Sequence, residues 1–355
     1  MVNNVRSGQR RRGHAAQLKL AKSARRAVVE TVAWVKCVAG VPAYSRHRRH
    51  RGKIMVLMYH GIEAQELSPP CWHVISAVRL RRQLRYVARR FQVLPIETAL
   101  ERLRQGALPA RAAVLTFDDG TRNLLVHAAP ILRELQLPAA VFLTTGVIGT
   151  RETLWPDRLW LAFARSGRHQ IDLTDLGLGM RSLVDTAERG ATYADAVKRL
   201  KDLDDDMRIR EFEKIVAELG PADTDPGPFQ MLSWDEARDL TRDSLVTLHP
   251  HSVTHPILSR CDDDKVESEI IQSCAALQRF TGEPPKVFAY PNGRAQDFDE
   301  RARTVLQKAG VTWSLSTMTG LADRESDPLA LPRIGIGSDL SFSRFRLLVS
   351  GAELP

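Results

Sequence analysis

The chain has 355 residues, of which 43% are hydrophobic and 26% are charged, an ordinary globular composition. This length suffices for one large domain with appendages or for two domains. No uncharged apolar stretch reaches the roughly 18 residues of a membrane-spanning helix, and no apolar segment with a cleavage site follows the basic first residues. We therefore expect no transmembrane helix, no signal peptide and a cytoplasmic location. The cysteines form no C-x-x-C pair, which argues against a cysteine-rich zinc site or a disulfide framework and favours buried or half-buried thiols at Cys37, Cys71, Cys261 and Cys274.

The net charge of +9 is concentrated at the start of the chain. Residues 1–53 contain fourteen Lys and Arg and one acid, whereas the remainder contains 37 Lys and Arg and 41 Asp and Glu. We expect a basic, partly helical N-terminal extension over 1–53, with disorder over 1–13, an amphipathic helix over 14–38 and a charged linker over 46–51. This extension could lie on an anionic membrane, at the periphery of the inner membrane, or pack on the body, or remain solvated. Because the remainder is net acidic, no nucleic-acid partner is expected.

From Ile54 onward, short apolar runs rich in Val, Ile, Phe and Thr recur along the chain. Each is too short for a buried helix, so the pattern predicts buried parallel strands. The seven runs are IMVLMY (54–59), AAVLTF (112–117), AAVFLTT (139–145), SLVTLH (244–249), KVFAY (286–290), VTWSL (311–315) and ALPRIGI (330–336).

Amphipathic helical patterns lie between several of these runs, over residues 76–91, 123–136, 233–243, 263–280 and 297–309. Strands that alternate with helices indicate an α/β fold, either a parallel barrel or a doubly wound sheet, and seven strands favour an incomplete barrel. Residues 150–230 interrupt the alternation with a polar, helical pattern, which predicts an insertion that shapes the substrate entrance. The main domain is expected over 54–350.

The first chemical motif is Thr116-Phe117-Asp118-Asp119-Gly120, in which two carboxylates follow directly on an apolar strand. Catalytic groups of α/β barrels sit at the carboxyl ends of the strands. Two adjacent carboxylates repel each other, so a nearby cation is expected to stabilise them. A polar turn with an Asp-Gly corner is the alternative interpretation.

The second motif is His251-Ser-Val-Thr-His255-Pro, directly after the run SLVTLH. Zinc is commonly held by two histidines and a carboxylate, with one position left for water, so this spacing indicates metal ligands. His249 lies two residues before His251 and is a spare ligand candidate. A cluster of structural histidines is the alternative.

Two weaker motifs also close apolar runs. Phe288-Ala-Tyr290-Pro291-Asn-Gly forms a tight turn whose backbone N–H could face a developing oxyanion. Leu57-Met-Tyr-His60-Gly closes the first run and supplies one further histidine. Parallel strands end at one edge of their sheet, so the four motifs are expected to meet there.

With these motifs in order, residues 54–345 resemble the NodB-homology polysaccharide deacetylases, also called carbohydrate esterase family four. The resemblance implies a distorted (β/α) barrel of about seven parallel strands and a metal-dependent reaction with Zn²⁺ or another divalent transition metal. It implies that Asp118 is the catalytic base, that Asp119, His251 and His255 are the metal ligands, and that the backbone amide of Tyr290 helps to bind the oxyanion.

The chain departs from the usual family pattern in three places. The late Leu-x-His motif of the general acid is missing, but LMYH resembles the early-strand histidine of the permuted poly-N-acetylglucosamine deacetylases, which assigns the acid to His60. The arginine that precedes the Tyr-Pro motif is absent, and nearby Lys286 does not replace it. The Asp-Trp motif has no counterpart, so Pro291 and Trp313 are the residues expected to contact substrate.

The resulting hypothesis is a metal-dependent hydrolase that removes the N-acetyl group from an N-acetylated sugar in a polysaccharide, oligosaccharide or lipid-linked glycan. The first alternative is a metal-dependent or metal-independent hydrolase of a non-sugar amide, such as a ureide or imide. The second is a carbohydrate-binding relative without activity, although such a protein would not need a carboxylate beside the metal ligands.

Overall fold

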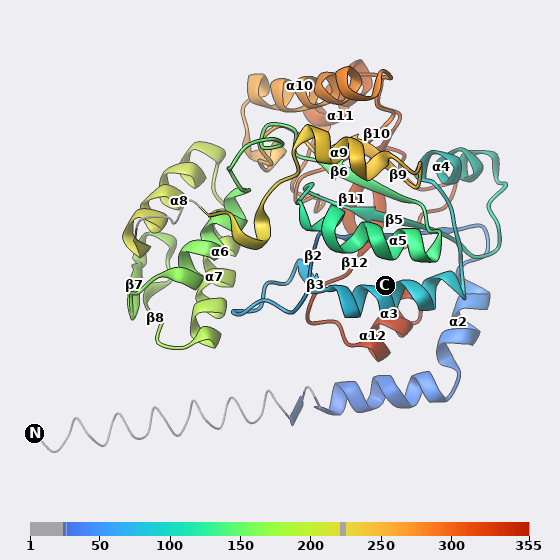
Figure 1. Cartoon of the computed structure of the whole chain (residues 1–355), viewed down its shortest axis with the longest axis horizontal. Helices are drawn as coiled ribbons and strands as arrows, with labels where there is room; N and C mark the ends of the chain where they lie inside the picture. Colours follow the sequence, from blue (N-terminus) through green and yellow to red (C-terminus); the bar gives the residue numbers. More distant parts are fainter. Residues whose placement is uncertain (1–23, 26, 221–224, 355) are drawn as a thin grey trace, which may run out of the picture. The chain divides into compact units, whose positions relative to one another are not determined.

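The computed structural model describes residues 24–25, 27–220 and 225–354. The chain divides into two compact units, one made of residues up to 49 together with 340–354, and the other made of 50–339. Figure 1 shows the elements of both units. The expected disorder over 1–13 and the first part of the helix expected over 14–38 lie outside the described residues.

The larger unit is built on seven parallel strands, and each predicted run overlaps one of them; β9 extends one residue and β11 four residues beyond the predicted ends. In sheet order they are β10 (Val287–Ala289), β11 (Trp313–Thr319), β12 (Leu331–Gly335), β1 (Ile54–Tyr59), β5 (Ala112–Phe117), β6 (Ala139–Leu143) and β9 (Val246–Pro250). The side chains of β1, β5 and β6 are buried on both faces, which explains why these strands read as unbroken apolar runs.

The two end strands, β9 and β10, lie close together without a strand ladder between them. The strands therefore form a nearly closed, distorted (β/α) barrel, and the predicted fold class is confirmed.

Helices cover the outside of the barrel where the sequence predicts them. They are α3 (Ala77–Ala88), η1 and α5 (Leu124–Ala128 and Ala129–Leu135), α9 (Trp234–Thr241), α10 (Asp263–Thr281) and α11 (Glu300–Lys308). Their starts are marked in the sequence, because Ser233, Asp262 and Asp299 each accept a backbone N–H of the first turn. One further helix, α4 (Ile96–Gln105), and three very short strands, β2 (Gly61–Glu63), β3 (Val74–Ser76) and β4 (Gln92–Val93), were not predicted.

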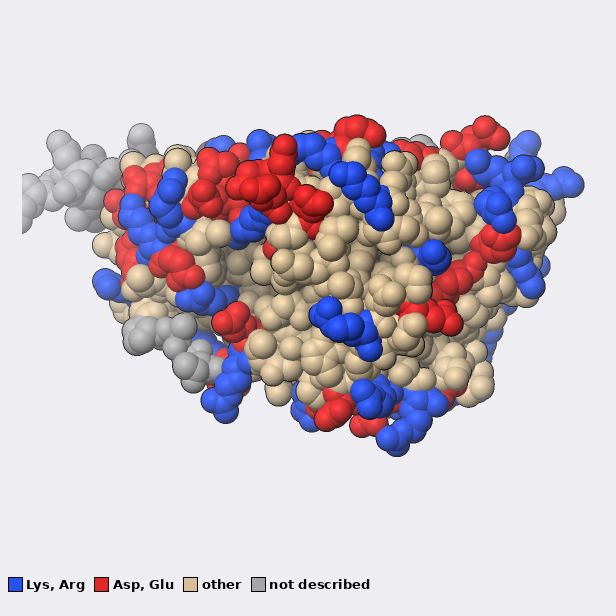
Figure 2. Space-filling view, turned by 90° about the horizontal axis from the view of Figure 1, so that it is seen from above, with Lys and Arg blue, Asp and Glu red and all other residues tan. Residues whose placement is uncertain are grey.

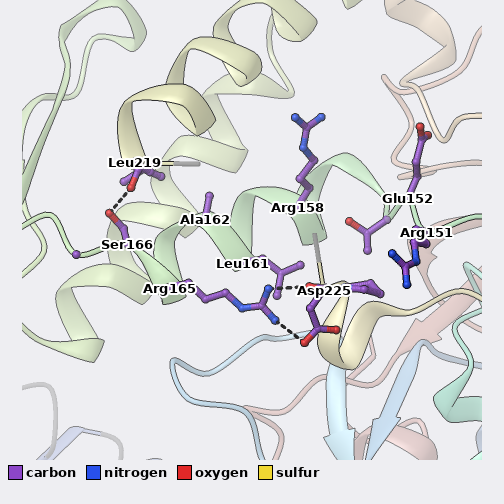
Figure 3. A pocket seen from close by; sticks show the side chains of 13 residues that line it. Arg151, Glu152, Arg158, Leu161, Ala162, Arg165, Ser166, Leu219 and Asp225 are labelled. Atoms are coloured by element: carbon purple, nitrogen blue, oxygen red, sulfur yellow. Dashed lines mark hydrogen bonds and ion pairs between the residues drawn. The ribbon is translucent and has the colours of Figure 1, made fainter. Parts of the chain in front are cut away.

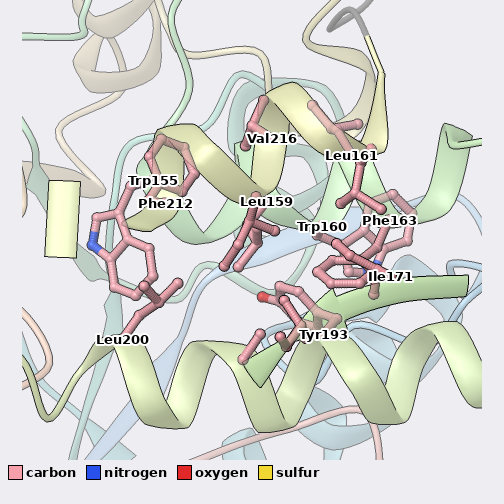
Figure 4. Close-up of a cluster of buried hydrophobic side chains, with 14 of the residues drawn as sticks. Trp155, Leu159, Trp160, Leu161, Phe163, Ile171, Tyr193, Leu200, Phe212 and Val216 are labelled. Atoms are coloured by element: carbon pink, nitrogen blue, oxygen red, sulfur yellow. The ribbon is translucent and has the colours of Figure 1, made fainter. Parts of the chain in front are cut away.

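The predicted insertion lies between β6 and β9. It contains the helices α6 (Trp155–Arg165), α7 (Thr186–Leu200) and α8 (Asp205–Leu219), and the short helical turns η2 (Thr174–Leu176) and η3 (Gly227–Phe229). It also contains an antiparallel hairpin of β7 (Gln170–Leu173) and β8 (Gly179–Ser182), which a purely helical prediction missed. Its helices pack around their own hydrophobic cluster, which includes Leu159, Phe163 and Tyr193 (Figure 4).

The face of the protein shown in Figure 2 carries mixed charge. On the face in Figure 2, acidic and basic side chains are intermingled around a centre of other residues. This face therefore has no extended patch of a single sign.

The smaller unit contains a helix over residues 27–38, α2 (Val41–Arg49) and α12 (Phe342–Val349). Ala33 and Cys37 pack against Leu347, and Lys36 pairs with Glu353 at 3.6 Å. The helix expected over 14–38 is confirmed for 27–38, but the linker expected over 46–51 is wrong for 46–49, because these residues complete α2. Residues 340–354 group with this unit and not with the barrel, unlike the expected main domain over 54–350.

Among the described residues, no single helix is long and apolar enough to cross a membrane. Residues 27–38 and 41–49 meet that test only as a pair that is bent by 73°. All four cysteines are free and buried, as expected.

Candidate active site

The carboxyl ends of the barrel strands surround a pocket of about 380 Å³. The pocket is lined by residues from all four sequence motifs, namely Met58, His60, Asp118, Asp119, His251, His255, Tyr290 and Asn292. The expectation that these motifs meet at one edge of the sheet is therefore confirmed. The insertion supplies a further wall, which contains Leu154, Pro156, Asp157, Tyr193, Ala194, Val197, Lys198 and Lys201.

The two adjacent carboxylates stand on a strained turn at the end of β5. Asp119 has a left-handed φ of 76°, and Gly120 follows with a φ of 89°. The Asp118 N–H donates to the Tyr59 carbonyl at 2.9 Å, and the Thr144 N–H donates to the Asp119 carbonyl at 3.1 Å. A non-glycine residue in this conformation is uncommon and is a recurring feature of functional sites. The turn sends the two carboxylates in different directions.

Asp119 faces the two histidines of the second motif. Its Oδ1 lies 3.7 Å from Nε2 of His251 and 3.5 Å from Nε2 of His255. One ligand atom from each of the three residues lies within 4.8 Å of the other two. The second ring nitrogen of His251, Nδ1, donates to the Ala289 carbonyl at 2.7 Å. This bond crosses the seam between β9 and β10 and leaves Nε2 as the unprotonated, ligating nitrogen.

The protonation of this triad fits a divalent cation. Asp119 Oδ1 is buried and has no hydrogen-bond partner. Burial, followed by repulsion from Asp157 and Asp118, raises the pKa of Asp119 to about 8, whereas burial is the main cause that lowers the pKa of His251 and His255. Neutral imidazoles are the form that binds metal, and a cation would supply the counter-charge that the Asp119 carboxylate lacks. The residues present therefore fit a metal site with two His and one Asp.

His249 is not part of this triad, so its assignment as a spare ligand was wrong. Its Nε2 lies 2.9 Å from Thr247 Oγ1 and 3.3 Å from Glu97 Oε1, and its ring packs on Phe142.

The loop that carries the two histidines is held by Glu269 of α10. The Glu269 carboxylate accepts the backbone N–H groups of Val253 and Thr254, both at 2.8 Å. Within the loop, His255 has a φ of 61° and donates its backbone N–H to Ser252 Oγ at 3.0 Å. Glu269 was missed because it lies inside an ordinary amphipathic helix, where a carboxylate carries no distinguishing signal.

Asp118 is paired with Arg333, which is completely buried on β12. The Arg333 Nη1 donates to Asp118 Oδ1 at 2.8 Å, and its Nε donates to the Ser316 carbonyl at 2.8 Å. Burial by itself would raise the pKa of Asp118, but attraction to Arg333, and then to His251 and His60, holds that pKa below its usual value. Asp118 is therefore an ionised carboxylate beside the triad, 4.0 Å from His251 Nε2. An arginine inside the apolar run ALPRIGI was the available signal for this residue.

His60 lines the pocket next to Trp72 and His73, with ring centroids at 5.3 and 5.8 Å. Its Nδ1 is buried without a partner, and burial, only partly opposed by Asp118, lowers its pKa to about 3. His60 is therefore neutral at neutral pH, whereas a general acid must carry a proton when it acts.

The pKa of the neighbouring His73 is shifted in the opposite direction to that of His60. Nε2 of His73 lies 2.8 Å from Asp157 Oδ1, and both residues are buried. Burial by itself would lower the pKa of His73, but its interactions with Cys71 and Asp157 hold that pKa well above its usual value. This ion pair, which joins the insertion to the barrel, could not be found from sequence because its partners are 84 residues apart.

Three substrate or oxyanion assignments do not agree with the structure. The Tyr290 N–H already donates to the Leu315 carbonyl at 3.0 Å as part of the pairing between β10 and β11, so it is not free for an oxyanion. Pro291 is buried and does not line the pocket, whereas the next residue, Asn292, does. Trp313 begins β11 at the amino end of the strand and packs against the cluster that contains Leu315. Because the site lies at the carboxyl ends, Trp313 cannot form its wall.

A second cavity, of about 1010 Å³, lies within the insertion (Figure 3). Arg165 on its wall donates to the Asp225 carbonyl at 2.7 Å, and Arg158 pairs with Glu213 at 2.7 Å. The metal triad is not among the residues that line this cavity.

A nearly closed parallel barrel thus carries, at the carboxyl ends of its strands, an ionised aspartate beside an Asp-His-His triad that fits a metal ion. The family model described as polysaccharide deacetylase matches residues 105–314, more than half of the chain. The chain therefore belongs to the polysaccharide deacetylase family. His60 and Arg333 lie outside the matched range.

Solved structures with the same fold include deacetylases from several bacteria. The chain is 18% identical to the Streptococcus pyogenes deacetylase PplD in complex with acetate, covering 84% of this chain and 98% of that one, with a TM-score of 0.54. It is 16% identical to IcaB from Ammonifex degensii (85% and 99% covered, TM-score 0.53) and 15% identical to a de-N-acetylase from Aggregatibacter actinomycetemcomitans (83% and 99% covered, TM-score 0.51). At these identities the likeness establishes the fold alone. No curated protein matches the sequence.

Proposed function

We propose that this protein is a metal-dependent deacetylase that hydrolyses the N-acetyl group of an N-acetylated sugar in a polysaccharide, oligosaccharide or lipid-linked glycan. The observation that carries the proposal is the ionised Asp118 beside the Asp119, His251 and His255 triad in one pocket. Membership of the polysaccharide deacetylase family supports the same reaction class, the hydrolysis of an amide bond on a sugar. A binding protein would have no use for a carboxylate that a buried arginine keeps ionised.

The triad would hold a divalent cation, with Zn²⁺ as our proposal because two imidazoles and one carboxylate suit it. Such an ion, when bound, supplies Lewis acidity that lowers the pKa of water and polarises the acetamide oxygen. The Ala289 carbonyl and Glu269 fix the orientation of the two histidines, so the ligand atoms are arranged in advance.

Asp118 is the base in this proposal. It removes a proton from the attacking water, whose oxygen forms a bond to the acetyl carbon, and the bond between carbon and nitrogen then breaks to give acetate and an amine. Arg333 keeps Asp118 ionised before this step. The amine nitrogen must gain a proton as it leaves, and His60 lines the same pocket.

Because His60 starts neutral, it can only deliver a proton that it first takes up during the reaction. The Asp118 carboxylate favours a positive charge on His60, so the proton that Asp118 removes from water can pass to His60 and then to the amine. The low pKa of His60 makes the second transfer favourable.

The test is acetate release from N-acetylglucosamine oligomers by the zinc-loaded chain. Asp118→Asn should reduce turnover by ~10²–10⁴ and keep about one metal ion per chain by elemental analysis. Asp175→Asn, at an exposed carboxylate of the insertion, is the matched control and should retain activity. Full turnover in Asp118→Asn would show that the base is wrong. Hydrolysis of ureides or imides without acetate release from sugars would favour the non-sugar amidase.

We also propose that the smaller unit contacts an anionic membrane surface, which would place the protein in the cytoplasm at the inner membrane. Seven of the large apolar side chains that the described part of the chain exposes lie between residues 28 and 44, among them Trp34 at 59% exposure. Basic residues, including Arg48 and Arg49 of α2, follow them closely. Apolar side chains beside cations suit the interface of an anionic bilayer.

Sedimentation of the full chain with vesicles tests this contact. Binding should be stronger to phosphatidylglycerol than to phosphatidylcholine vesicles, and the double change Trp34→Ser and Val35→Ser should weaken it. Equal recovery in the supernatant with both lipids would dismiss the membrane proposal without affecting the enzymatic one.

A further inference from the structure

Cationic side chains from two distant segments meet at the active-site pocket. Lys198 and Lys201 stand at the carboxyl end of α7 in the insertion, and Arg294 stands in the segment between β10 and α11. All three line the pocket that contains the metal triad. A helix carboxyl end favours lysines in general, but this does not explain why these two border the same pocket as an arginine from another element.

The charge of these cations is only partly balanced. Arg294 binds Asp297 through Nε at 3.0 Å and Nη2 at 3.1 Å. Within the described part of the chain, neither Lys198 nor Lys201 forms an ion pair or a side-chain hydrogen bond, whereas Lys214 of the same insertion pairs with Asp175.

Lys201 and Arg294 are half-buried, whereas Lys198 is exposed. Burial, and then repulsion from Arg294, lower the pKa of Lys201 to about 8. An ammonium group that is partly desolvated and close to a second cation is costly unless an anion joins them. An anion bound between these cations would therefore be favoured by their charge.

The position of Lys201 relates this charge to the reaction centre. Lys201 lines the same pocket as the metal ligands Asp119, His251 and His255. Asp119 in turn attracts the proton of Lys201. A group bound beside Lys201 therefore lies in the same pocket, of about 380 Å³, as the reaction centre.

One neutral donor adds to the cations. Asn292 lines the pocket two residues before Arg294, and its Nδ2 is buried with no hydrogen-bond partner. Its left-handed φ of 61° and the bond from Thr317 Oγ1 to its carbonyl, at 2.6 Å, hold it in place. This part of the pocket thus presents N–H donors, which suit a group with several acceptor oxygens.

We propose that Lys201, together with Lys198, Arg294 and Asn292, forms a subsite for an anionic group of the substrate, a phosphate or a carboxylate carried by or next to the N-acetylated sugar. The inference rests on the proposed deacetylase function and narrows its substrate to an anionic glycan. The insertion, which supplies both lysines, is then the element that sets substrate choice, while the barrel supplies the chemistry.

The test compares matched probes that differ only in charge or in the kind of anion. They are N-acetylglucosamine, N-acetylglucosamine 1-phosphate and N-acetylmuramic acid, which carries a carboxylate. Binding is measured by calorimetry on the full chain with Asp118→Asn, so that no probe is consumed, and acetate release is measured on the chain with Asp118 intact.

The charged probes should bind more tightly than the neutral one. Lys201→Ala should reduce this preference, the ratio of the two dissociation constants, on the order of tenfold, because it removes a charged hydrogen-bond donor. Lys201→Arg should restore most of the preference, and Lys201→Glu should reverse it. Lys214→Ala, which removes a paired lysine outside the pocket, should leave the ratio as it is. The probe that depends more strongly on Lys201 identifies phosphate or carboxylate as the anion.

A preference that Lys201→Ala and Lys201→Glu leave unchanged in folded, metal-loaded protein would overturn the subsite, even if acetate release confirms the deacetylase. Conversely, a charge preference that depends on Lys201 in a chain that releases no acetate from any probe would support the subsite and reject the proposed reaction.

Discussion

The pair formed by Arg333 and Asp118 makes the sharpest prediction about catalysis. Replacing Arg333 by Met keeps most of the side-chain volume and removes the charge that faces Asp118 at 2.8 Å. Burial then acts on the Asp118 carboxyl without its largest opposing interaction, so its pKa must rise.

The size of the rise follows from the contact. A hydrogen bond to a charged group contributes about 1.5–3 kcal/mol, and one pKa unit corresponds to about 1.36 kcal/mol. The pKa of Asp118 should therefore rise by about one to two units in Arg333→Met. A base works only when ionised, so activity is lost as the pH falls through this pKa, and the acid limb of the profile should move to higher pH by the same amount.

The measurement is kcat/KM for acetate release as a function of pH, with metal content determined for each sample. Arg333→Lys keeps a positive charge but not the planar donor fork, so its acid limb should lie between those of the wild type and Arg333→Met. Arg303→Met, which breaks a pair with Asp327 on the surface, is the control for the loss of an arginine. An acid limb that stays in place in folded, metal-loaded Arg333→Met would refute the role given to Arg333.

Two further predictions concern the scaffold of the pocket. Asp157 holds His73 charged, and a raised histidine pKa contributes stability that is complete below the unfolded pKa of about 6.5 and is lost as the pH rises through the folded pKa. Asp157→Asn should therefore lower the free energy of unfolding by about 1.5–3 kcal/mol near pH ~6 and by much less in alkaline solution, as measured by denaturant titration; a pH-independent loss would contradict the charged pair. Glu269→Gln weakens the bonds that hold the loop of His255, so zinc affinity by competition with a chelator should fall ~10–100-fold, while Glu267→Gln on the same helix should leave it unchanged. Unaltered zinc affinity in Glu269→Gln would show that the loop keeps its shape without this carboxylate.

The elements that could be predicted are those whose formation depends on residues close together in the sequence. The bounds of β1 and β5 agree with the apolar runs residue for residue, because strands buried on both faces tolerate few polar side chains. The hairpin of β7 and β8 escaped prediction because two strands of four residues carry too short an alternation to be distinguished from a loop.

The errors at the site have a common cause. Trp313 was chosen for its residue type, although it stands at the amino end of its strand, away from the pocket. The Tyr290 amide was assigned by resemblance, but whether a backbone N–H is free depends on the neighbouring strand, which takes it up through Leu315. Both assignments needed the arrangement of strands around the barrel.

The sequence by itself determined the seven strands, their parallel arrangement, the insertion, and the Asp-Asp and His-x-x-x-His motifs, since each depends on apolar runs or on residues close together in the chain. Only the tertiary structure decided which side chains complete the site. Arg333 meets Asp118 across 215 positions, Asp157 meets His73 across 84, and Lys201 comes to the pocket from the insertion. Such pairs form only when distant segments pack against each other in the folded protein. A pattern of residues that are neighbours in the chain therefore cannot predict them.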